Sequence, residues 1–156
     1  VGAALGMDVI AWSRNLTAER AAAAGARLVD KQALLREADV VTLHLVLSER
    51  SRGTIGAADL ALMKRTAFLV NTSRGPLVDQ AALIAALTEG RIAGAGLDVF
   101  DQEPLPAGHP LLAAPNTVLT PHLGYVTEEN FRAYYASAVE SILGYCAGTP
   151  VRQIKD

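Results

Sequence analysis

Apolar runs of strand length alternate along this chain with longer segments in which alanine and leucine recur at helical spacing. The apolar runs are residues 8–12, 27–29, 40–45, 66–70, 93–100 and 117–121. The helical segments are residues 18–24, a segment from residue 30 onward, 55–64 and 80–89. Because the runs are short and rich in β-branched residues, they are typical of buried parallel strands. The alternation predicts an α/β fold, a doubly wound parallel sheet with helices between its strands.

The two ends of the chain are predicted to be helical. Residues 1–7 are interpreted as the last turns of a helix, because no capping residue stands ahead of them. Thr127 is expected to cap a long final helix whose apolar stripe packs against a core or another domain. The stripe consists of Phe131, Tyr134, Tyr135, Ala138, Ile142 and Tyr145.

Three successive predicted strands end in ionisable side chains. Arg74 follows the run 66–70, Glu103 follows 93–100, and His122 follows 117–121. In an open parallel sheet the carboxyl ends of the strands form the ligand-binding edge, so these side chains are expected to lie near one another. A single loop arginine is more often simply solvated, and the inference depends on all three occurring together.

These three residue types suit hydride transfer to a 2-oxo acid. An arginine such as Arg74 holds a carboxylate with two parallel hydrogen bonds, which lysine cannot imitate. His122 is the candidate acid/base that exchanges the proton of the alcohol. Glu103 is expected to orient the imidazole and to raise its basicity. The predicted catalytic set is therefore Arg74, Glu103 and His122.

The end of the run 8–12 bears on the choice of cofactor. A Rossmann strand at this place usually ends in a carboxylate that binds the adenosine ribose hydroxyls. This chain has Ser13 followed by Arg14 instead. Arg14 could pair with a ribose 2′-phosphate, which favours NADP over NAD, or it could be a solvated turn arginine. The loop 48–52 is interpreted as a solvated, charged face.

Composition excludes several classes of protein. Of the 156 residues, 51% are hydrophobic and 19% are charged, which is typical of a globular domain. A net charge of −2 gives no electrostatic reason to expect nucleic acid or an anionic membrane surface as a partner. No run of apolar residues is long enough to span a membrane. The single cysteine, Cys146, argues against a disulfide framework and a cysteine metal site, and a cytoplasmic location is expected.

Three blocks of sequence resemble the signature blocks of a known family. Residues 71–75, 97–104 and 121–124 are similar, in order and in spacing, to those of the D-isomer-specific 2-hydroxyacid dehydrogenases. The resemblance implies a Rossmann-type dinucleotide-binding domain that uses NAD or NADP. It also implies a small D-2-hydroxy acid or 2-oxo acid as the substrate, and a homodimer as the assembly.

The resemblance also assigns cofactor contacts. It places Asp98 against the nicotinamide carboxamide, although a simple turn residue is the alternative, and it places His44 on the loop that passes the adenine side. His44 is expected to contact the cofactor or to be structural, and no proton transfer is assigned to it. The full set of cofactor-binding residues predicted is Ser13, Arg14, His44, Thr72, Ser73, Arg74, Asp98, His122 and Gly124. No metal site is expected.

In the family, a strand and a Gly-x-Gly-x-x-Gly phosphate turn precede the segment that corresponds to residues 1–7. Neither is found in this sequence, and that strand would lie centrally, between the runs 8–12 and 40–45. Residues 1–147 are therefore expected to form a dinucleotide-binding domain that is incomplete at its amino end. Residues 148–156 are expected to lead back toward a substrate domain. The segment 1–156 is expected to have no dehydrogenase activity when it is expressed alone.

Two alternatives to this enzyme remain open from the sequence. One is a nicotinamide-sensing co-regulator that uses the same fold without turnover. The other is a formate- or phosphite-type dehydrogenase with a similar cofactor domain.

Overall fold

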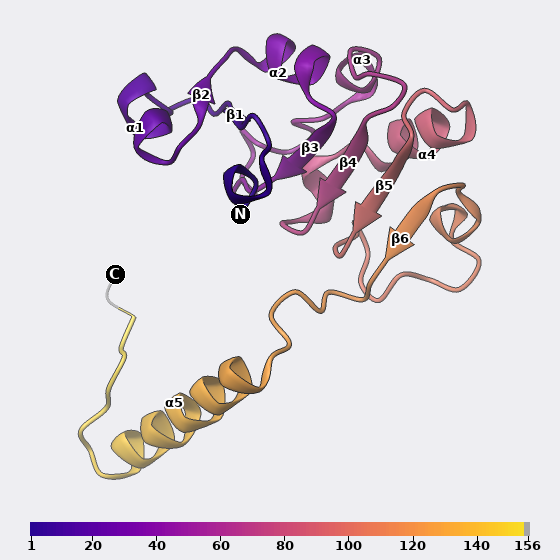
Figure 1. Ribbon diagram of the computed structural model, residues 1–156. Coiled ribbons are helices and arrows are strands. Elements are labelled where there is room, and N and C mark those ends of the chain that lie inside the picture. The colour runs from indigo at the N-terminus through magenta and orange to yellow at the C-terminus, as the bar shows by residue number, and fades with distance from the viewer. Residues whose placement is uncertain (155–156) are drawn as a thin grey trace. The chain divides into compact units, whose positions relative to one another are not determined.

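A computed structural model describes residues 1–154 and divides them into two compact units. The first unit runs from Val1 to His122, and the second begins at Leu123. Figure 1 shows strands and helices alternating through the first unit, whereas the second contains one long helix. The two units are described separately.

The first unit contains six parallel strands in two sheets. The larger sheet has the order β3-β4-β5-β6, and the smaller one pairs β1 with β2. The strands are β1 (Ile10–Ala11), β2 (Arg27–Leu28), β3 (Val40–Leu43), β4 (Phe68–Asn71), β5 (Gly94–Leu97) and β6 (Thr117–Leu119). The predicted α/β fold with parallel strands is confirmed. Several strands are shorter than predicted, and the run 93–100 leaves the sheet at Leu97.

The two sheets are separate from each other. The sequence predicted a missing central strand at this place, between the runs 8–12 and 40–45. Within residues 1–154, β1 pairs only with β2, and β3 pairs only with β4. Residues of both edges, including Ile10 and Val41, line a cavity of about 510 Å³. The observed strand orders are compatible with the predicted sheet, and the place of a central strand between β1 and β3 stays a prediction.

Three α-helices of the first unit begin at capping side chains. The side chains of Thr17, Asp30 and Asp79 each accept a hydrogen bond from the backbone N–H three residues later. The α-helices are α1 (Ala18–Ala23), α2 (Lys31–Glu37), α3 (Ala57–Leu60) and α4 (Gln80–Thr88). Three 3₁₀ helices are η1 (Ala3–Leu5), η2 (Gly75–Leu77) and η3 (Pro110–Ala113). The segment 1–7 thus forms one 3₁₀ turn, and the predicted helix 55–64 contracts to α3.

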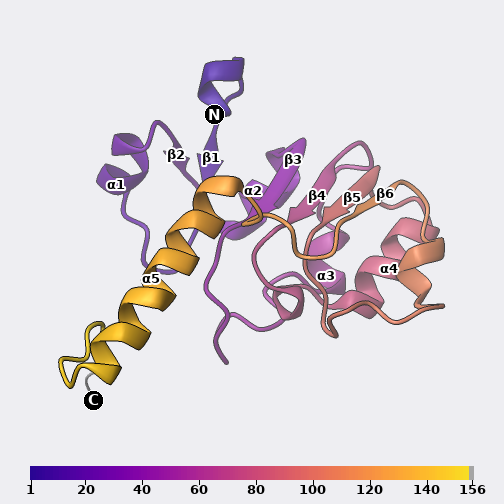
Figure 2. The ribbon, with the colours of Figure 1, turned by 90° about the horizontal axis from the view of Figure 1, so that it is seen from below.

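Helices α3 and α4 lie along the same side of the larger sheet (Figure 2). The core between them is built largely from leucines that are fully buried, among them Leu60, Leu69 and Leu83. On the sheet, β3 and β4 alternate between buried and more exposed positions. Val40 and Phe68, which pair in register, are each about half exposed on the opposite face. The buried face of the sheet thus holds the strand ends in fixed register.

The second unit consists of α5 (Glu128–Cys146) and the chain around it. Thr127 caps α5 by accepting a hydrogen bond from Asn130 N, as predicted. No residue of α5 is buried, and its predicted apolar stripe is largely exposed. The packing role of that stripe therefore stays a prediction. Among residues 1–154, no helix is long and apolar enough to cross a membrane.

Candidate active site

Glu103 and His122 form a hydrogen-bonded pair at the carboxyl ends of neighbouring strands. Glu103 follows β5 and His122 follows β6, and Glu103 Oε2 lies 2.7 Å from His122 Nδ1. The other carboxylate oxygen, Oε1, accepts the backbone N–H of Phe100 at 2.9 Å. His122 has a left-handed backbone with φ of 58°, which is uncommon for a residue with a side chain. One oxygen of Glu103 therefore contacts the imidazole, and the other holds the carboxylate to the backbone of its own loop.

The environment of Glu103 favours its charged form. Desolvation by burial is the largest influence and acts to raise its pKa. Hydrogen bonds from His122 and from the Phe100 N–H, together with the charges of His122 and Arg74, act in the opposite direction and prevail. The pKa of Glu103 is therefore lower than that of an ordinary glutamate. A carboxylate beside the imidazole is the arrangement expected for orienting an acid/base histidine.

Arg74 stands on a tight turn that the buried side chain of Asn71 holds together. Asn71 ends β4 and is 1% exposed. Its Nδ2 donates to the carbonyl of Arg74 at 2.9 Å, and its Oδ1 accepts the N–H of Ser73 at 3.1 Å. The guanidinium of Arg74 is exposed, and its charge reaches Glu103. The structure thus brings the three predicted catalytic residues to one edge, and Asn71 has a positioning role that the sequence did not reveal.

The turns after β4 and β5 approach each other closely at Gly75. A Cβ added to Gly75 would lie 2.1 Å from the carbonyl carbon of Phe100 and 2.6 Å from the nitrogen of Asp101. Only glycine fits at this approach. Gly75 directly follows Arg74, and the Phe100 N–H donates to Glu103. The contact between Gly75 and Phe100 therefore sets the spacing between the loop that carries Arg74 and the loop that carries Glu103.

Asp98 directly follows β5 and is 6% exposed. Its Oδ1 accepts the hydroxyl of Thr120 at 2.5 Å, which ties the end of β5 to the end of β6. Its backbone N–H donates to the carbonyl of Asn71 at the end of β4. Asp98 therefore joins three strand ends, and its predicted contact with the carboxamide stays a prediction.

Other predicted cofactor contacts lie along the same edge. Ser73 Oγ donates to the carbonyl of Leu45 at 2.9 Å, which links the turn after β4 to the end of β3. His44 is exposed and its Nε2 lies 3.0 Å from Thr42 Oγ1. Thr72 is exposed on the Arg74 turn. Gly124 belongs to the second unit, and its place at the site stays a prediction.

A mostly apolar cavity of about 500 Å³ adjoins the catalytic pair. Glu103 and His122 line it together with leucines from the surrounding loops, which are Leu105, Leu112 and Leu119. The two ionisable side chains thus stand at the margin of a largely apolar lining, and each stays about a third exposed. The pair therefore borders a space of ligand size.

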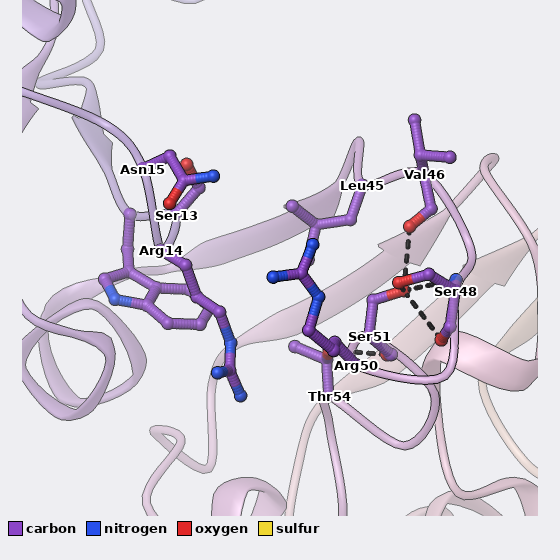
Figure 3. Close-up of a pocket in the computed structure, with 10 residues that line it drawn as sticks. Ser13, Arg14, Asn15, Leu45, Val46, Ser48, Arg50, Ser51 and Thr54 are labelled. Atoms are coloured by element: carbon purple, nitrogen blue, oxygen red, sulfur yellow. Dashed lines mark hydrogen bonds between the residues drawn. The ribbon is translucent and has the colours of Figure 1, made fainter.

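A second pocket, with both polar and apolar lining residues, lies at the carboxyl ends of β1 and β3. It has a volume of about 180 Å³, and Ser13 and Arg14 line it as predicted. Ser48, Arg50 and Ser51 also line it, although the sequence had indicated only a solvated face for their loop (Figure 3). Hydroxyls and guanidinium groups with no carboxylate among the lining residues suit a phosphate-bearing nucleotide. This donor set fits the ribose end of a dinucleotide cofactor.

No group of three or more His, Cys, Asp and Glu side chains within residues 1–154 is arranged to hold a metal ion. The ionisable groups of the site instead pair with one another or with the backbone.

The chain is similar to known proteins along most of its length. A family model described as the NAD binding domain of D-isomer specific 2-hydroxyacid dehydrogenases matches residues 1–124. A glyoxylate reductase of Aeropyrum pernix is 44% identical over 148 residues, which are 95% of this chain and 44% of that protein. A glyoxylate/hydroxypyruvate reductase B of Citrobacter koseri is 48% identical over 123 residues, which are 79% of this chain and 38% of that protein. The chain thus spans less than half the length of these relatives.

A solved structure shares the fold. The NAD-complexed form of a D-isomer specific 2-hydroxyacid dehydrogenase from Lactobacillus delbrueckii ssp. bulgaricus superposes with a TM-score of 0.82 at 35% sequence identity. The match covers 99% of this chain and 50% of that one. The Rossmann-type fold predicted from the sequence is therefore confirmed.

Proposed function

Because the chain belongs to the D-isomer-specific 2-hydroxyacid dehydrogenase family through its NAD-binding domain, we propose that the protein is an oxidoreductase acting on a small 2-oxo acid. The reaction interconverts the 2-oxo acid and the D-2-hydroxy acid with a nicotinamide cofactor. The single observation that carries the proposal is the pairing of Glu103 with His122 at 2.7 Å beside the charge of Arg74. Glyoxylate and hydroxypyruvate are the first substrates to test, since relatives are named for them.

Each of the three residues has a defined task. Arg74 binds the substrate carboxylate and orients the ketone. His122 donates a proton to the ketone oxygen during reduction and takes it back during oxidation. The proton moves through Nε2, because Nδ1 is bonded to Glu103. When bound, the nicotinamide supplies the hydride that reaches C2 in reduction and accepts it in oxidation.

Glu103 acts through His122. Its ionised carboxylate fixes the tautomer and the orientation of the imidazole and stabilises the protonated ring. Asn71 and Gly75 act one step further away, because they fix the turn that carries Arg74. The strand ends thus hold the reacting groups in place before the substrate arrives.

The cofactor contacts follow from the same edge. Thr72, Ser73, Asp98 and Gly124 are assigned to the nicotinamide and its ribose, and Ser13 and Arg14 to the adenosine ribose. We favour NADP over NAD, since Ser13 replaces the usual carboxylate, which would repel a 2′-phosphate, and Arg14 follows it as a partner for that phosphate. His44 is assigned to the adenine side. A dinucleotide-binding domain over residues 1–147, a homodimer and a cytoplasmic location complete the proposal.

The test is a steady-state assay of the protein at its full natural length. Oxidation of NADPH and of NADH is followed with glyoxylate, hydroxypyruvate and pyruvate, and a reaction without any acid is the control. Acid-dependent oxidation is expected, with the D-enantiomer as the product from hydroxypyruvate. An absence of acid-dependent oxidation with all three acids would contradict the proposed activity.

A further inference from the structure

Two arginines from distant parts of the sequence extend into the same pocket. Arg14 follows β1 and Arg50 lies on the loop after β3, and both line the pocket of about 180 Å³ at the ends of these strands. Figure 3 shows Arg14 and Arg50 entering the space between these two segments. Ser13, Ser48 and Ser51 add hydroxyl groups to the lining.

Neither guanidinium has a counter-ion in the part of the chain that the structure describes. Residues 1–154 provide no hydrogen bond and no ion pair to the side chain of Arg14 or Arg50. Arg27 and Arg91, by contrast, each pair with a nearby glutamate. No aspartate or glutamate is among the residues that line the pocket. Two like charges that share a pocket favour an anion between them.

The loop that carries Arg50 is held in place without using its side chain. Ser51 Oγ donates to the carbonyl of Val46 at 2.7 Å and accepts the N–H of Ser48 at 2.7 Å. Thr54 Oγ1 donates to the carbonyl of Ser51 at 2.6 Å. The guanidinium of Arg50 is therefore available to a ligand at little further cost in loop ordering.

We infer that Arg50 acts with Arg14 as a pair of arginines that bind a phosphomonoester on the ribose of the cofactor. The inference rests on the proposed function, which places the adenosine ribose at this pocket. A phosphomonoester carries a charge of about −1.5 to −2 near neutral pH, so two guanidinium groups match it better than one. Arg50 is thus a second determinant of specificity, supplied by a loop that the sequence assigned to solvent.

The experiment measures the binding of two nucleotide probes by calorimetry, using the protein at its full natural length. Adenosine 2′,5′-bisphosphate carries the extra phosphate, and adenosine 5′-monophosphate does not. Arg50→Gln should weaken the bisphosphate by about tenfold or more, because a charge-assisted contact is lost, and should change the monophosphate by less than about twofold. Arg14→Gln should behave similarly. Arg52→Gln is the matched control, because it removes a charge from the same loop outside the pocket lining.

The result that overturns the inference is unchanged binding of the bisphosphate in Arg50→Gln, or wild-type protein that binds both probes equally or neither. The proposed activity is tested separately with NADH, which has no 2′-phosphate. Acid-dependent oxidation of NADH alongside unchanged binding in Arg50→Gln would remove the role of Arg50 and keep the proposed function. If Arg50→Gln loses bisphosphate affinity and the wild-type protein has no activity on any acid, the role of Arg50 is kept and the proposed function is removed.

Discussion

Glu103 contacts His122 through one carboxylate oxygen while the other holds the backbone of its own loop. Oε2 lies 2.7 Å from His122 Nδ1, and Oε1 accepts the Phe100 N–H at 2.9 Å. The carboxylate therefore cannot rotate without breaking a bond to the loop after β5. This double use makes the orientation of the imidazole depend on the fold itself.

The lowered pKa of Glu103 gives a pH-dependent contribution to stability. A carboxylate with a depressed pKa in the folded state stabilises the fold above its unfolded pKa of about 4.3 and loses that contribution as the pH falls through the folded value. Glu103→Gln should therefore be less stable than wild type at about pH 7, by about 1 kcal/mol or less, because the pair is partly exposed. The difference should shrink toward about pH 3.5.

Urea unfolding midpoints at both pH values measure this difference. Glu49→Gln serves as the control, since it removes an exposed carboxylate that has no hydrogen bond among the described residues. A difference between wild type and Glu103→Gln that grows as the pH falls would show that the sign of the argument is wrong.

Arg74→Lys tests whether two-point binding of the substrate carboxylate matters. Lysine keeps the charge but offers a single point of attachment, so KM for glyoxylate should rise by about tenfold and kcat should also fall. Arg65→Lys is the matched control, because Arg65 is exposed just before β4 and takes no part in the site. Equal kinetic constants for wild type and Arg74→Lys would mean that Arg74 does not bind the carboxylate.

Asn71→Ala tests the buried side chain that ties the Arg74 turn. The change leaves the Ser73 N–H and the Arg74 carbonyl without their partner, so the free energy of unfolding should fall by about 2 kcal/mol and KM should rise. Asn130→Ala removes a comparable but exposed bond to Tyr125 and should cost less than about 1 kcal/mol. The prediction fails if chemical denaturation finds the two variants equally stable.

Gly75→Ala tests the close approach of the turns after β4 and β5. The new Cβ would overlap the Phe100 backbone, so the variant should lose about 3 kcal/mol of stability and most of its activity. Gly96→Ala is the control, because its Cβ would meet nothing nearer than Val70 Cγ2 at 3.9 Å. Thermal melts of the two variants compare them directly, and similar melting temperatures would refute the proposed tight contact.

The strands could be predicted because each is a short apolar run between helical segments, but their ends could not. Val99 and Phe100 are buried although they lie beyond β5. Their burial comes from loop packing, and an apolar run cannot distinguish loop packing from a hydrogen-bonded strand. Ile55 was predicted to begin a helix, but it lies before α3, where it is buried and forms an isolated parallel bridge with Val78.

The gathering of Arg74, Glu103 and His122 could be predicted because strand ends in a parallel sheet meet at one edge, whereas their catalytic roles stay a prediction. Asn71 was visible only as part of a motif, since its role depends on a turn that forms in three dimensions. The sequence placed Arg50 on a solvated face. Its proximity to Arg14 could not be predicted, because it depends on the segments after β1 and β3 lining one pocket. The close approach of Gly94 to the Asn116 carbonyl likewise depends on how loops pack in three dimensions.

The role of His122 is the central claim, and His122→Ala tests it most directly. In the protein at its full natural length, kcat for glyoxylate reduction should fall by about 10²-fold or more, since proton transfer from a positioned side chain is lost. Cofactor affinity, measured by calorimetry on the same preparation, should stay within about twofold of wild type, because the variant removes only the acid/base. Turnover at the wild-type rate in His122→Ala would contradict the account.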